Sequence, residues 1–81
     1  MEKEINIKYF ALFREQAAKS SETISTSAET VDELFQELSQ KYKFSLNSDQ
    51  VRVSINEEFK DMTYTLSSHD CIVFIPPVAG G

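Results

Sequence analysis

The feature that most constrains the fold is an amphipathic helix near the middle of the chain, at residues 30–42. Thr30 and Glu33 form a T-x-x-E capping box, in which the threonine side chain accepts a hydrogen bond from an orphan amide and the glutamate reaches back. An apolar stripe must be covered, and a sheet formed by the rest of the chain is the available partner. The stripe has helical spacing and contains Val31, Leu34, Phe35, Leu38 and Tyr42.

The chain before this helix predicts a strand, a short helix and a second strand. The first strand is expected at residues 5–12, where Ile5 and Ile7 alternate with polar residues before the segment becomes apolar on both sides. Good helix formers without a breaker indicate a short helix at residues 13–19. Residues 22–27 are rich in threonine and isoleucine, which favour strands, so the two strands should pair antiparallel.

The chain after the helix predicts two further strands. Residues 51–55 alternate between apolar and polar side chains, as a half-buried strand does. The segment NEEFKD, residues 56–61, is interpreted as a turn or short excursion that carries one apolar group, Phe59. The continuous apolar run CIVFI, residues 71–75, is typical of a strand covered on both faces.

The order of these elements predicts the α+β class, with one main helix packed on a mixed sheet. It matches the β-grasp (ubiquitin-like) arrangement, in which an N-terminal hairpin precedes a helix that crosses the sheet and the last strand lies beside the first. We expect one β-grasp domain at residues 1–75 and an extended, flexible C-terminal tail at residues 76–81.

Composition excludes several function classes. The net charge is −5 and the eight basic residues are scattered, so we expect no nucleic-acid partner. No apolar run approaches the ~20 residues of a membrane span, and the N-terminus lacks a signal-peptide pattern, so a cytoplasmic protein without a membrane partner is expected. The single cysteine, Cys71, excludes an internal disulfide and a cysteine-based zinc site, and we expect no metal.

The sequence contains no convincing catalytic constellation. His69 and Asp70 are neighbours in a polar turn, and Cys71 begins an apolar strand without a nearby base to lower its pKa. Glu57 and Glu58 are adjacent in a turn, where a solvated role is the ordinary one. A phosphate-binding loop is excluded because both glycines lie in the last two positions. An autonomous enzyme is therefore not expected, and neither is a permanently bound cofactor.

The last six residues, PPVAGG, contain both prolines and both glycines of the protein. The proline pair fixes two φ angles, removes two backbone donors and ends the last strand. From the second proline the remaining chain reaches at most about 13–14 Å, at ~3.3–3.6 Å per residue. A segment this slim could thread a channel into another protein's active site and present a terminal carboxyl without a Cβ. A frayed terminus or a cloning scar are the alternatives.

Three segments resemble the molybdopterin synthase small subunit family, a family of sulfur carriers with the β-grasp fold. They are DCIVFIPPVAGG, which resembles the family's C-terminal signature, INIKYFALFREQA, which resembles its first strand and short helix, and VSINEEF, which resembles its third strand. Two departures are visible. Phe74-Ile75 stands where an aromatic pair often precedes the prolines, and His69-Asp70 stands where Gly-Asp is frequent.

The resemblance implies a specific chemistry for Gly81. An adenylyltransferase of the ubiquitin-activating type would use ATP to convert its carboxylate to an acyl-adenylate, and a sulfur donor enzyme would supply persulfide sulfur to form a thiocarboxylate. The large synthase subunit would accept the tail, and sulfur would pass to cyclic pyranopterin monophosphate in molybdenum cofactor biosynthesis. The other catalytic groups would lie on that subunit, in a heterotetramer. The residues that would thread into it are Pro76, Pro77, Val78, Ala79 and Gly80.

A partner-binding patch is expected on the apolar second faces of the first and last strands. Leu12 and Val73 are candidates from the strand pattern, and each apolar candidate could instead belong to the core. The predicted partner-binding residues, four of them from the resemblance, are Phe10, Arg14, Phe59, Phe74 and Ile75.

Other functions stay open at this point. A sulfur carrier for thiamine synthesis would also end in Gly-Gly, but as a rule lacks the PPVAGG context. A ubiquitin-like modifier would be joined to lysines through Gly81. A non-catalytic interaction module would only dock its tail.

Overall fold

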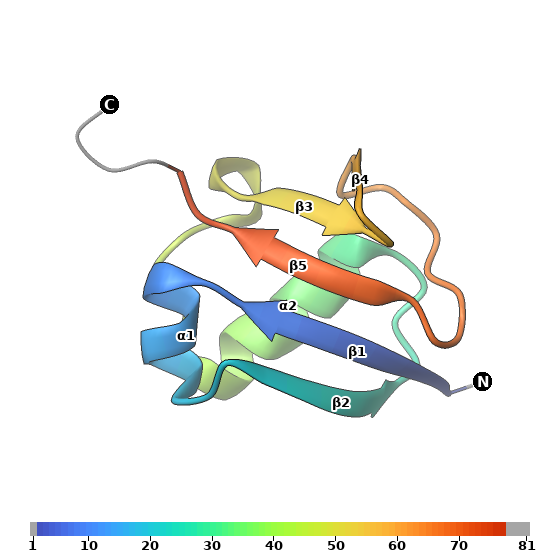
Figure 1. The fold of residues 1–81 in the computed structure, drawn as a ribbon, viewed down its shortest axis with the longest axis horizontal. Helices are drawn as coiled ribbons and strands as arrows, with labels where there is room; N and C mark the ends of the chain where they lie inside the picture. The colour runs from blue at the N-terminus through green and yellow to red at the C-terminus, as the bar shows by residue number, and fades with distance from the viewer. Residues whose placement is uncertain (1, 78–81) are drawn as a thin grey trace.

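A computed structural model describes residues 2–77, which form a five-stranded mixed sheet with the longer helix lying across one face (Figure 1). The elements have these bounds, in chain order: β1 Lys3–Tyr9, α1 Ala11–Ala17, β2 Ser21–Thr26, α2 Val31–Tyr42, the 3-10 helix η1 Ser48–Gln50, β3 Arg52–Ile55, β4 Glu58–Lys60 and β5 Cys71–Ile75. Within residues 2–77, no helix is long and apolar enough to cross a membrane.

The strand order is β2-β1-β5-β3-β4, and it confirms the predicted β-grasp topology. β1 pairs antiparallel with β2, and the central pair of β1 and β5 is parallel. β5 pairs antiparallel with β3, which also forms a hairpin with β4. The last strand therefore lies beside the first, and it ends at the side of the sheet where α1 lies (Figure 1).

Helix α2 has the predicted bounds, and its cap differs in one detail. Thr30 Oγ1 accepts a hydrogen bond from the Glu33 amide at 3.2 Å, as the capping box requires. The Glu33 carboxylate bonds the amide of Glu29 at 2.9 Å, one residue earlier than the box predicts. Four residues of the stripe are buried against the sheet and Tyr42 is half-buried.

An aromatic cluster fills the core between α2 and the sheet. Phe13 of α1 lies with its ring centroid 4.9 Å from that of Phe44 and 5.9 Å from that of Phe35. Phe74 of β5 packs on Phe35 at 5.4 Å. Edge-on aromatic pairs of this kind contribute about 0.5–1.5 kcal/mol each beyond the burial of their area. They join both helices to the central strand.

Two predicted boundaries in the hairpins are wrong. The first strand ends at Tyr9, because Ala11 takes a left-handed φ of 49° and begins α1. The excursion at residues 56–61 contains a strand, β4, which forms a hairpin with β3 through a tight turn at Asn56 and Glu57. The sequence pattern did not indicate β4 because all three of its residues are exposed.

The prediction that β5 is covered on both faces is also wrong. Ile72 and Phe74 are fully buried, whereas Cys71 is exposed and Val73 and Ile75 are only half-buried. Side chains alternate across a strand, so the three less buried residues lie on the face opposite α2. This second face of the sheet, called the outer face below, carries no helix (Figure 1).

A buried carboxylate fixes the start of β5. Asp70 accepts hydrogen bonds from the Asn56 side-chain amide at 2.9 Å and from the Ser67 amide at 2.8 Å. The Asn56 side-chain oxygen in turn accepts from the Cys71 amide at 3.0 Å. These bonds tie the β3–β4 turn to the turn before β5, so Asp70 has a structural role beside the exposed His69.

Candidate functional site

The outer face brings apolar side chains together beside the end of β5. Strand register places Lys8, Val73, Ser54 and Phe59 in one row across β1, β5, β3 and β4. The next row toward the tail contains Ile75 and Arg52. The sequence alone could not assemble these rows, because they depend on which strands are neighbours.

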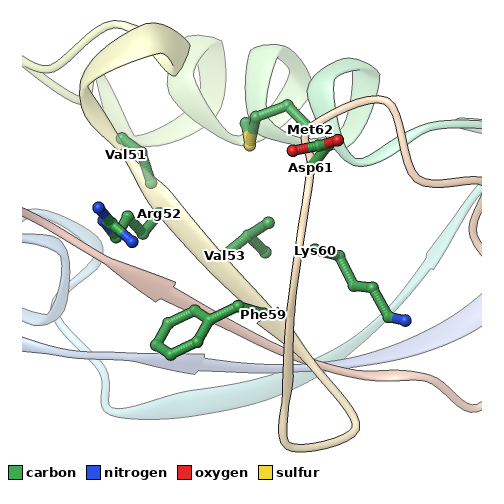
Figure 2. Close-up of a pocket in the computed structure, with 7 residues that line it drawn as sticks. All are labelled: Val51, Arg52, Val53, Phe59, Lys60, Asp61 and Met62. Carbon is green, nitrogen blue, oxygen red and sulfur yellow. The ribbon is translucent and has the colours of Figure 1, made fainter.

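Two large aromatic side chains are exposed at the ends of this face. Phe10, directly after β1, is 49% exposed, and Phe59 on β4 is 68% exposed. Figure 2 shows that Phe59 and Arg52 extend to the same side of β3. The seven residues labelled in Figure 2 line a hollow beside β3 and β4: Val51, Arg52, Val53, Phe59, Lys60, Asp61 and Met62. Exposed apolar groups clustered on a small domain indicate a contact surface for another molecule.

A mostly apolar groove lies at the root of the tail. Ile75, Pro76 and Pro77 line this groove, together with Phe10. Sequence reasoning missed Glu15 and Leu46. Leu46 was overlooked because it lies in a polar turn segment, SLNSDQ, where a single leucine gives no periodic signal. The remaining lining residues are Ala11, Leu12, Glu15 and Leu46.

The predicted partner-binding residues do not all lie on this surface. Phe10, Phe59 and Ile75 are on or beside the outer face, and Arg14 is exposed on α1 but does not line the groove. Phe74 is fully buried and packs on Phe13 and Phe35, so the prediction that it contacts a partner is wrong. Its neighbour Ile75 points to the opposite face because side chains alternate along β5.

The predicted tail is described only at its root. Pro76 is half-buried and Pro77 is exposed, and both follow β5 without an intervening linker. The predicted reactive residue and most of the threading segment lie outside the described residues: Val78, Ala79, Gly80 and Gly81.

The most perturbed ionisable groups lie on the α2 side of the sheet. Glu22 accepts hydrogen bonds from the hydroxyls of Tyr9, at 2.5 Å, and Tyr42, at 2.7 Å, and Lys19 lies 3.3 Å away. Burial alone would raise the pKa of Glu22, but these three donors lower it below its usual value. Burial first, and then the Glu22 carboxylate, raise the pKa of Tyr9.

This cluster is a structural clamp. Its carboxylate is occupied by donors from β1 and α2, so it joins those elements to β2 and is not free to act as a base. Among residues 2–77, no group of three or more histidine, cysteine or acidic side chains is placed to hold a metal ion.

Comparison with known proteins agrees with this fold. The profile of the ThiS family matches residues 7–81. A putative molybdopterin converting factor subunit 1 from Pyrococcus furiosus is 26% identical, with a TM-score of 0.75 and coverage of 94% of this chain and 99% of that one. Small archaeal modifier protein 1 from Methanosarcina acetivorans is 24% identical, with a TM-score of 0.78 and coverage of 100% and 99%.

A third similar structure is a complex. The protein–protein complex of subunits 1 and 2 of molybdopterin-converting factor from Helicobacter pylori contains a chain that is 23% identical. Its TM-score is 0.63, and the alignment covers 96% of this chain and 99% of that one. The chain thus shares its fold with molybdopterin converting factor subunits and with a small archaeal modifier protein.

Proposed function

The chain belongs to the ThiS family, and from that premise we propose that it is the sulfur-carrier subunit of molybdopterin synthase. The observation that carries the proposal is the family match through Gly81, in a segment that directly follows β5. The likeness to a putative molybdopterin converting factor subunit 1 supports the molybdopterin branch of this chemistry.

The proposed reaction takes place on the carboxylate of Gly81. A free carboxylate is a poor acyl donor, so an adenylyltransferase partner first uses ATP to form the acyl-adenylate and pyrophosphate. A persulfide of the sulfur donor attacks the acyl carbon, and AMP leaves. A thiol then cleaves the acyl disulfide, which leaves the thiocarboxylate on Gly81 and a disulfide on the donor. This product donates sulfur to cyclic pyranopterin monophosphate.

The described residues serve this chemistry by holding and aiming the tail. Pro76 and Pro77 end the sheet, because they lack the amides that a further ladder would need. The outer face, with Phe10, Phe59 and Ile75, offers a docking surface next to the tail root. We propose that the activating enzyme and the large synthase subunit bind there in turn, the latter in a heterotetramer. The Helicobacter pylori complex supports a partner of this kind.

The proposal also makes this chain a non-autonomous component of a transferase in the cytoplasm. We assign the remaining catalytic groups to the large subunit, since the Glu22 carboxylate in this chain is already bonded to the hydroxyls of Tyr9 and Tyr42. The single cysteine is compatible with a reducing compartment.

Intact-mass measurement tests the proposal. After incubation with the cognate adenylating enzyme, ATP and a persulfide donor, the protein should gain about 16 Da, the difference between sulfur and oxygen. Deletion of Gly81 should abolish this gain and leave the thermal unfolding midpoint unchanged, because Gly81 lies six positions after the last residue of β5 in the sequence. Loading of the deletion variant, or an unchanged mass of the full chain, contradicts the mechanism.

A protein modifier is the second candidate, because the small archaeal modifier protein 1 has the same fold. Addition of the large subunit and the pterin precursor separates the two readings. Formation of molybdopterin supports the synthase subunit, whereas conjugates on lysines of other proteins support the modifier. A loaded protein that gives neither product favours a thiamine-type carrier.

A further inference from the structure

Two cations flank the apolar centre of the outer face. Lys8 on β1 stands beside Val73, and Arg52 on β3 stands beside Ile75, so that β5 lies between the two charges. Both cationic side chains are exposed. Neither was predicted as a partner-binding residue from the sequence, because their strand neighbours were not known.

The register fixes the spacing of the two charges. They are separated by two strand spacings of about 4.8 Å and by an offset of two residues along β5, about 3.3 Å each. Their Cα atoms are therefore roughly 12 Å apart on a diagonal across Val73 and Ile75. A partner that covers Val73 and Ile75 would therefore have one cation on each side of its contact area.

Neither cation forms an ion pair in the described part of the chain. Within residues 2–77, the ion pairs use Lys19, Lys60 and His69, and none uses Lys8 or Arg52. Asp61 lines the same hollow as Arg52, but no ion pair joins these two side chains. Two exposed cations beside an apolar centre favour an acidic counterpart on a partner.

We propose that Lys8 and Arg52 are recognition residues for a partner protein whose docking surface has an apolar centre flanked by two carboxylates. Val73 and Ile75 would bury against the apolar centre, while the cations pair with the carboxylates at the rim. Rim charges of this kind steer association and set the orientation of the bound partner. The inference rests on the proposed function in taking the adenylating enzyme as the occupant.

Neutralisation of single charges tests the inference. Arg52→Gln and Lys8→Gln should each weaken binding to the adenylating enzyme about two- to fivefold at low ionic strength, chiefly through slower association. The difference should vanish at about 0.5 M salt, where exposed charges are screened. Lys43→Gln is the matched control, because it removes one exposed cation at the end of α2, behind the sheet. Equal unfolding midpoints would exclude a folding defect.

Binding to the adenylating enzyme and sulfur loading are measured separately, so that the two proposals can fail independently. If the wild-type chain is loaded and Arg52→Gln binds as tightly as Lys43→Gln at low salt, the recognition role is overturned and the carrier function stands. If the wild-type chain binds but is never loaded, the carrier function is overturned, and a salt-dependent loss in Arg52→Gln still supports the recognition role. Absence of binding between the wild-type chain and the adenylating enzyme overturns both.

Discussion

Replacement of Glu57 by glycine should stabilise the fold, because this residue holds a conformation that favours glycine. Asn56 and Glu57 form the two-residue connection between β3 and β4, with φ angles of 52° and 73°. Positive φ at both central positions is the pattern of a type I′ hairpin turn, whose preferred sequence is Asn-Gly. Asn56 suits its position, whereas Glu57 carries a Cβ where glycine is favoured.

The expected gain follows from two opposing contributions. A side chain in the left-handed region costs roughly 1–2 kcal/mol, which glycine avoids. Glycine loses about 0.5–1 kcal/mol more conformational freedom on folding. The difference between the two contributions is about 0–1.5 kcal/mol, with a central value of ~0.75 kcal/mol in favour of glycine. In a domain of this size each kcal/mol shifts the unfolding midpoint by ~4–8 °C, so the central value corresponds to a rise in Tm of about 3–6 °C for Glu57→Gly.

Calorimetry on two control variants tests whether the gain is specific to position 57. Asn56→Gly should give a smaller gain, because asparagine tolerates the left-handed region. Gln40→Gly, on the exposed side of α2, should lower the free energy of unfolding by about 1 kcal/mol, which confirms that glycine is not stabilising in general. A Tm for Glu57→Gly that is lower than wild type, or no higher than that of Asn56→Gly, would refute the reasoning.

Two further predictions concern the carboxylate of the structural clamp, Glu22, and the aromatic residues Phe74 and Phe59 on opposite faces of the sheet. Because the folded pKa of Glu22 is lowered, its stabilising effect is complete above the unfolded pKa and is lost as the pH falls through the folded value. Glu22→Gln should therefore lose about 1 kcal/mol at pH 7 in urea unfolding and approach wild type in acid; a constant difference down to low pH contradicts this. Phe74→Ala should cost about 3–5 kcal/mol. Phe59→Ala should change stability by less than about 0.5 kcal/mol while weakening partner binding, and equal destabilisation by both changes would overturn the assignment of faces.

The sequence predicted the elements whose signals are local. The capping pattern at Thr30 marks the start of α2, and the apolar stripe from Val31 to Tyr42 has the spacing of one helix face. The strand at Cys71–Ile75 was found with correct bounds because Asp70 and Pro76 limit its apolar run. Given these elements, the β-grasp topology follows from few alternatives.

The sequence could not predict which side chains of β5 face α2 and which face outward. The wrong prediction for Phe74 follows from this. A continuous apolar run does not alternate, so the sequence does not say which of Phe74 and Ile75 faces the helix. The register decides, because Phe74 stands beside Tyr9 on the buried side. The pairing of Arg52 with Ile75 was equally hidden, since it depends on β3 and β5 being neighbours.

The tight turns of residues 2–77 are made without glycine. Six described residues have positive φ angles between 49° and 74°, and none of them is glycine. These are the positions where glycine would relieve strain, and each instead carries a side chain. Both glycines of the sequence stand together at positions 80 and 81, outside the described residues. In the sulfur-carrier proposal the carboxylate of Gly81 must first react with ATP, and a persulfide must then reach its acyl carbon. Residues without a Cβ leave room for both steps, so the proposal gives a reason for glycine at these two positions. The positive-φ residues are Ala11, Ala18, Lys43, Asn56, Glu57 and His69.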